Sequence, residues 1–183
     1  MAGPREEPLG RGRSELPAGT AGPAVGKPSQ VAGLGPSTHL ALGEAHSCAL
    51  QADGAIQCWG AGERGQLGDG GRADRSRPAR VVGLQDAVAL VCGRAHACAL
   101  LRGGTVRCWG AGERGQLGSG AAEDAPLPVA VEGLGAARDL LAGDDFTCAL
   151  EQSGGVRCWG AGDRGQLGTG ATEDALRPVP VRW

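Results

Sequence analysis

Short apolar runs separated by turn residues recur along most of the chain. Between residues 78 and 127 these runs are 79–82, 87–91, 97–101 and 105–109. Runs of this length that are bounded by Gly and Pro predict β-strands rather than helices. Their apolar side chains do not alternate cleanly with polar ones, as expected for a sheet that packs on both faces. The pattern therefore predicts an all-β fold with four short strands in each stretch of this length.

The chain repeats itself when it is shifted by 50 residues. The string CWGAG begins at Cys58, Cys108 and Cys158, and the string RGQLG begins six residues later each time. Prolines 28, 78, 128 and 178 mark one phase of the repeat, which gives units 28–77, 78–127 and 128–177 and the start of a fourth at 178–183. Four strands in each such unit are typical of a β-propeller blade.

The remaining segment, residues 1–27, is rich in Pro and Gly and predicts a flexible leader. It lacks the apolar core of a secretory signal, and no stretch of the chain reaches the ~18 apolar residues of a membrane helix. The chain as written therefore suggests an intracellular protein or one whose start is missing. Its 18 basic and 20 acidic residues give a net charge of −2 and argue against a nucleic-acid or membrane partner.

The cysteines recur in pairs that a hairpin would bring together. If Gly54 closes a three-residue loop, residue 51 faces residue 55, and counting back places Cys48 opposite Cys58. Facing residues at a non-hydrogen-bonded position lie within reach of a disulfide. We therefore predict three cross-strand disulfides, Cys48–Cys58, Cys98–Cys108 and Cys148–Cys158. Reduced thiols packed as small apolar groups are the alternative, and this is also the simplest interpretation of the unpaired Cys92.

Several motifs resemble cofactor, metal or catalytic sites, but a structural role in the repeat explains them better. Residues 60–65 match the dinucleotide-binding pattern, but they recur at the repeat period and no βαβ unit surrounds them. His46 and Cys48 share a strand face, yet their spacing matches no common zinc site. An acidic residue precedes Arg64, Arg114 and Arg164, which predicts an ion pair that braces each loop. We therefore predict no catalytic, metal or cofactor site.

What varies between the units is the better place to look for a binding surface. Such positions include Glu44, Arg94 and Asp144, which are equivalent in the three units. One further cluster of arginines occurs in the first unit alone and predicts contact with an acidic partner, with a solvated loop as the alternative. Its members are Arg72, Arg75, Arg77 and Arg80.

The strings CALQADGAIQCWGAGERGQLGDG and CALLRGGTVRCWGAGERGQLGSG resemble the repeats of the regulator of chromosome condensation family. The resemblance implies a seven-bladed propeller of four-stranded blades. Three units cannot close such a ring, so we expect an incomplete ring that self-associates or is completed by other blades. The third unit has Phe146 where His46 and His96 stand, so that histidine is not an essential ligand in every blade. The cysteine-bearing repeats are similar to those of bacterial, often exported, proteins.

The resemblance and the repeats together predict a non-catalytic protein-interaction scaffold without cofactors. The family also implies an alternative, guanine-nucleotide exchange on a small GTPase, for which no residue carries over. A truncated gene fragment without independent function is a third interpretation. Formation of the disulfides would place the protein outside the cell or at its surface, whereas reduced thiols would place it in the cytoplasm.

Overall fold

The computed structural model of the protein describes residues 30–182, so the expected leader at 1–27 lies outside the described residues. All the strands that the structure describes lie within the unit Val31–Trp183. These strands are β1 (Ser37–Leu42), β2 (His46–Gln51), β3 (Ile56–Gly60), β4 (Arg75–Arg80), β5 (Ala87–Cys92), β6 (His96–Leu101), β7 (Val106–Gly110), β8 (Ala125–Ala130), β9 (Ala137–Ala142), β10 (Phe146–Glu151), β11 (Val156–Gly160) and β12 (Ala175–Pro180). No helix within residues 30–182 is long and apolar enough to cross a membrane.

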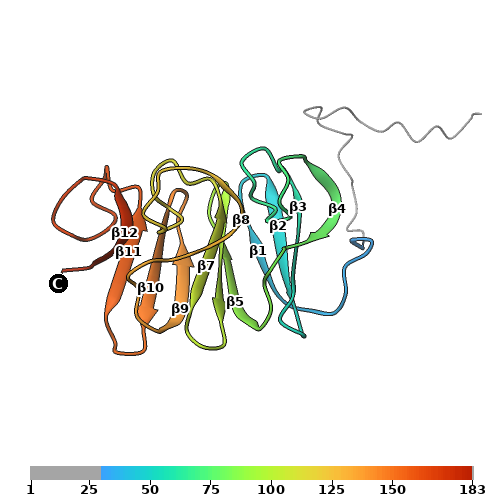
Figure 1. Ribbon diagram of the computed structural model, residues 1–183, viewed down its shortest axis with the longest axis horizontal. Helices are drawn as coiled ribbons and strands as arrows, with labels where there is room; N and C mark the ends of the chain where they lie inside the picture. Colours follow the sequence, from blue (N-terminus) through green and yellow to red (C-terminus); the bar gives the residue numbers. More distant parts are fainter. Residues whose placement is uncertain (1–29, 183) are drawn as a thin grey trace, which may run out of the picture. The chain divides into compact units, whose positions relative to one another are not determined.

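The strands form three antiparallel sheets in chain order, β1-β2-β3-β4, β5-β6-β7-β8 and β9-β10-β11-β12. Figure 1 shows the three sheets one beside the next, without closure into a ring. The predicted all-β fold of four-stranded propeller blades is confirmed. The strand that contains Pro78 pairs with β3 and completes the first sheet. The blades therefore run in a different phase of the 50-residue repeat from the units that are counted between prolines.

The central hairpin of each blade has the register that the glycine spacing predicts. In the first blade Gly54 has a φ of +81°, and its N–H donates to the Gln51 carbonyl at 3.0 Å. A residue with a Cβ is strained at such a φ, so glycine is needed there. The turn sets Cys48 opposite Cys58, and the equivalent turns do the same in the other two blades.

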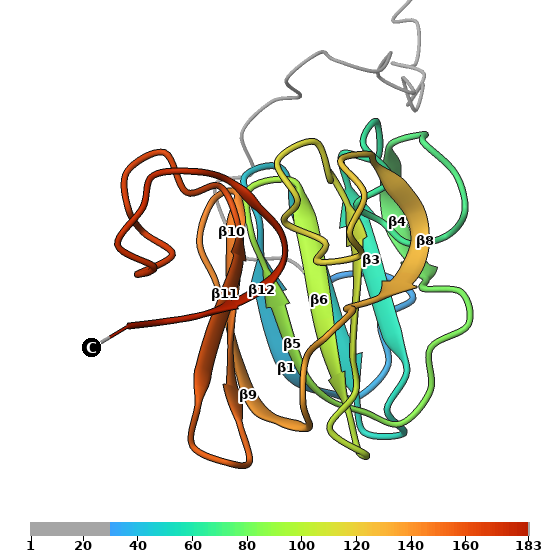
Figure 2. The same ribbon diagram turned by 60° about the vertical axis from the view of Figure 1, so that its left-hand side comes forward.

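The core consists of two apolar layers, one between each pair of neighbouring blades. The first layer joins Leu50, Ile56 and Leu67 of the first blade to Leu90 and Trp109 of the second, among others. The second layer repeats this arrangement between the second and third blades. The innermost strands β1, β5 and β9 lie side by side (Figures 1 and 2) and contact one another. Each blade is thus stabilised mainly by its neighbours, which explains why its strands are apolar on both faces.

Candidate functional site

Each blade-to-blade junction is locked by a buried tryptophan. Trp109 is fully buried, and its indole N–H donates to the Gln66 carbonyl of the preceding blade at 3.0 Å. Trp159 repeats the contact with the Gln116 carbonyl, also at 3.0 Å. The glutamines belong to the recurring RGQLG turn. The CWGAG string therefore supplies the donor, and the RGQLG string the acceptor, of a single contact between blades.

Ion pairs connect the same loops across the junctions. The Arg64 guanidinium donates to Asp124 at 2.8 Å and lies 3.0 Å from Glu113, and both carboxylates belong to the second blade. Arg114 repeats this with Asp174 and Asp163 of the third blade. The prediction that the arginine pairs with the acid beside it in its own loop is therefore wrong. The loop of each blade extends over the next blade, so the nearest carboxylates are those of the neighbour.

Replacing Asp124 with Asn should lower the free energy of unfolding by about 1 kcal/mol at neutral pH. The hydrogen bond from Arg64 is the main cause that lowers the pKa of Asp124 below its usual value. The stabilisation is therefore present above the unfolded pKa of about 3.9 and is lost as the pH falls through the lower folded pKa. Urea unfolding of both proteins between neutral pH and pH 3 measures it, and the variant should lose less stability on acidification.

The equivalent change in the first blade, Asp74→Asn, is the matched control. Asp74 accepts the N–H of Gly62 at 2.9 Å, as Asp124 accepts that of Gly112, but it has no arginine partner among the described residues. Because Asn retains a side-chain oxygen for the backbone contact, the control should cost much less. Equal losses in the two variants would show that the ion pair contributes nothing.

The three predicted cysteine pairs lie at disulfide distance. The sulfur atoms are 2.10 Å apart in Cys48–Cys58, 2.15 Å in Cys98–Cys108 and 2.10 Å in Cys148–Cys158. Cys92 is the one free cysteine among the described residues. Paired cysteines at this distance are compatible with an oxidising location.

Two of the four arginines in the cluster of the first unit form ion pairs within the chain. Arg75 on β4 forms an ion pair with Asp69 at 2.9 Å, and Arg72 lies 3.4 Å from Asp124. The other two arginines are exposed on β4 and have no ion pair among the described residues. These two, Arg77 and Arg80, are the members still available to an acidic partner.

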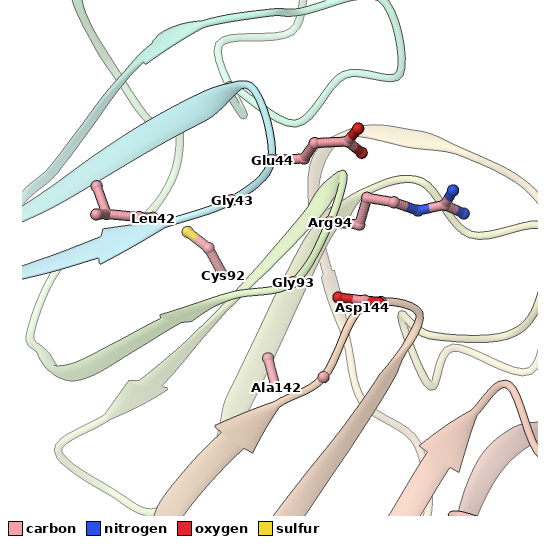
Figure 3. A pocket seen from close by; sticks show the side chains of 9 residues that line it. Leu42, Gly43, Glu44, Cys92, Gly93, Arg94, Ala142 and Asp144 are labelled. Carbon is pink, nitrogen blue, oxygen red and sulfur yellow. The ribbon is translucent and has the colours of Figure 1, made fainter.

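The varied loop positions meet in a pocket of about 550 Å³ at one end of the innermost strands (Figure 3). Glu44, Arg94 and Asp144 lie on its rim, each from a different blade. Backbone hydrogen bonds link them in series, from Glu44 N–H to the Arg94 carbonyl at 3.1 Å and from Arg94 N–H to the Asp144 carbonyl at 2.7 Å. The Arg94 guanidinium contacts Asp145 at 2.6 Å. Charged groups of both signs therefore surround an open pocket, and Cys92 also lines it.

The histidines of the first two blades have different surroundings. The His96 ring contacts the Thr147 hydroxyl at 2.9 Å. Neither ring nitrogen of His46 has a hydrogen-bond partner among residues 30–182, and burial lowers the pKa of the ring to about 4. It lies near Cys92, whose thiol pKa burial raises to about 12. Sequence reasoning could not identify this neighbour, because Cys92 belongs to the next blade.

Comparison with known proteins agrees with this architecture. The Regulator of chromosome condensation (RCC1) repeat matches residues 53–100 and 103–150, and a second description of the same repeat matches 38–66, 87–116 and 141–166. No curated protein matches the chain.

Among solved structures, the chain is similar to Prp20p of Saccharomyces cerevisiae, described with its binding properties to Gsp1p and histones. The sequence identity is 24 % and the TM-score 0.75, and the match covers 82 % of this chain and 39 % of Prp20p. Human WBSCR16 matches at 25 % identity with a TM-score of 0.72, over 80 % of this chain and 38 % of that one. The chain thus spans about two fifths of the length of these relatives. The repeats and the blade architecture agree, and the chain belongs to the regulator of chromosome condensation repeat family.

Proposed function

We propose that the chain is a non-catalytic protein-interaction scaffold, and that its two outer blade faces bind another blade of the same repeat. The observation that carries this proposal is that each outer face bears one half of the contacts that lock the internal junctions. Such a face is prepared for binding, because the blades that hold it are already ordered.

The face of the first blade bears the tryptophan half of the junction. Leu40 on this face is 64 % exposed, whereas the equivalent Leu90 is 6 % exposed inside the array. Trp59 is only partly buried, while Trp109 is fully buried. The indole N–H of Trp59 has no acceptor among the described residues, and the Asp74 carboxylate has no arginine partner among them. In the second blade, the equivalent Trp109 and Asp124 bind the loop of the preceding blade.

The opposite face, on the third blade, bears the loop half of the junction. The Gln166 carbonyl, equivalent to the acceptor of Trp109, receives no hydrogen bond from the described residues. The Arg164 side chain has no carboxylate partner among them, although Arg64 and Arg114 each have two. The two outer faces are therefore complementary to each other in shape, hydrogen bonding and charge.

A second copy of the chain meets these requirements directly. Head-to-tail contact would place Trp59 of one copy against the Gln166 carbonyl of the other, and Asp74 against Arg164. Such a heterologous interface closes into a ring when the rotation allows it. Two copies joined at both ends would give six blades, within the range of about 4–8 found in propellers.

The test is the mass of the purified chain in solution, measured by light scattering over a range of concentrations. We expect a defined dimer, and we expect Trp59→Ala and Arg164→Glu each to raise its dissociation constant at least about tenfold, since buried tryptophan and arginine anchors dominate interfaces. Arg102→Glu is the matched control, because Arg102 lies exposed in a hairpin turn of the middle blade. A soluble monomer, or a dimer that resists both changes, would contradict the proposal. A poorly soluble monomer would favour the interpretation of a truncated fragment.

The scaffold proposal has two further parts. The cysteine pairs support an extracellular or cell-surface location, where an oxidising environment would keep them joined. Arg77 and Arg80 are proposed to contact an acidic protein partner. Prp20p, a relative with binding properties to Gsp1p and histones, makes protein partners plausible for this chain. At 24 % identity the likeness supports no particular partner and no nucleotide exchange.

A further inference from the structure

The two internal junctions differ at a pair of positions around the buried histidine. In the second junction the His96 ring contacts the Thr147 hydroxyl, and position 142 is alanine. In the first junction the position equivalent to Thr147 is Ala97, and a cysteine, Cys92, stands at the position of Ala142. The first junction has therefore lost the hydroxyl partner of its histidine and gained a thiol beside it.

The His46 ring is buried without a hydrogen-bond partner among the described residues. The residue is 3 % exposed, and neither ring nitrogen has a hydrogen-bond partner within the described part of the chain. A buried polar group without a partner has lost its bonds to water without replacing them, so such groups are uncommon in stable folds. The lone pair of the His46 ring is therefore not engaged by the described residues and can bind a metal ion.

Two sulfur atoms surround this histidine. A ring nitrogen of His46 and the sulfurs of Cys48 and Cys92 all lie within 4.8 Å of one another. Cys58 lies directly across the hairpin from Cys48, with 4.1 Å between their Cα atoms. Cys92 comes from β5 and the others from β2 and β3, so the group spans two blades. Figure 3 shows the Cys92 side chain at the pocket, which offers a path from solvent.

We propose that the reduced chain binds one zinc ion through His46, Cys48, Cys58 and Cys92. Three thiolates and one imidazole form a common structural zinc set, and zinc takes four ligands in a tetrahedron. Reduction of the Cys48–Cys58 bond by a phosphine or a dithiol adds two electrons and two protons and gives two thiols. Zinc then displaces the protons of these thiols and of Cys92, and the neutral His46 ring contributes a lone pair.

His46 on β2 and Cys92 on β5 belong to neighbouring blades, so a metal ion bound by both would join the two blades. Coordination deprotonates a thiol outright, so the bound metal would hold the sulfurs as thiolates. The same side chains thus give a disulfide in an oxidising compartment and a zinc site that joins two blades in a reducing one.

The first experiment adds cobalt(II) to the full chain after anaerobic reduction with a phosphine and removal of excess reductant. Cobalt reports tetrahedral thiolate ligation by its visible and charge-transfer absorption. We expect one cobalt per chain, displaced by one zinc, although reduction frees the thiols of all three cysteine pairs. Cys92→Ser and His46→Phe should each weaken binding by more than about 100-fold, since even outer-shell changes cost 10–100-fold. Cys148→Ser is the matched control and should leave binding unchanged.

A second variant covers the case in which full reduction unfolds the chain. Cys58→Ser leaves Cys48 as a free thiol while the other two cysteine pairs stay joined, so no reductant is needed. Cobalt should bind this variant with two thiolates, and Cys58→Ser/Cys92→Ser should lose the charge-transfer band. The proposal is overturned if both proteins bind cobalt equally or neither binds it. Because these tests do not depend on association of chains, they are independent of the scaffold proposal.

Discussion

Replacing Trp109 with alanine is expected to lower the free energy of unfolding by about 3–5 kcal/mol, the usual cost of removing a buried aromatic side chain. Trp109 is fully buried in the layer between the first and second blades. The change would leave a cavity and would also strip the Gln66 carbonyl of the indole N–H that it accepts at 3.0 Å. Because each blade contacts only its neighbours, the middle of the array should lose its connection to the first blade.

Chemical denaturation followed by circular dichroism measures this loss, and the chain supplies its own control. Trp59→Ala removes the same side chain from the same strand position in the first blade, where the ring is only partly buried. We expect its effect on the stability of the isolated chain to be less than half as large, at a concentration at which chains do not associate. Equal effects at the two positions would contradict the assignment of Trp109 as the residue that locks the junction.

Removing the Cys98–Cys108 bond is expected to have the second largest effect. The double change to alanine should lower the free energy of unfolding by about 3 kcal/mol in an oxidising buffer. The estimate follows from the entropy of closing a short loop in the unfolded chain, since the two cysteines are 10 residues apart. Because both side chains are fully buried, the change also deletes two sulfur atoms from the core.

Thermal and urea denaturation of the oxidised proteins measure this effect, and Cys92→Ala is the matched control. Cys92 is half-buried and unpaired, and the equivalent position in the third blade is already alanine. The control should therefore change stability by less than about 1 kcal/mol. If the wild-type chain loses no stability when a reductant is added, the sulfur pairs are not joined in the native protein, and the extracellular interpretation fails with them.

Local geometry explains why the hairpins and their cysteine pairs were predictable. The position of Gly54 determines the length of the turn, and the turn determines which residues face each other for several steps along both strands. The same reasoning applies to Gly104 and Gly154, which have positive φ angles as well. Neither step depends on another blade, so a short stretch of sequence was sufficient.

The repeat also determined the kind of fold, because a unit that is apolar on both faces must be covered by its neighbours. It did not determine which strands belong to one sheet. A 50-residue period can be divided at any phase, and only the pairing of β4 with β3 shows where a blade ends. The matching phase of the prolines marks the repeat but not the boundary of a sheet.

Contacts between blades were decided by the tertiary structure alone. Arg64 stands beside Glu63 in the sequence, yet it pairs with Glu113 and Asp124, because the loop extends over the next blade. Cys92 and His46 are far apart in the sequence, and only the packing of β5 against β2 brings them together. The sequence by itself thus determined the repeat, the strands, the hairpin register and the cysteine pairs, which depend on short-range geometry. The ion pairs, the pocket and the candidate zinc ligands depend on how one blade lies against the next, and this required the fold.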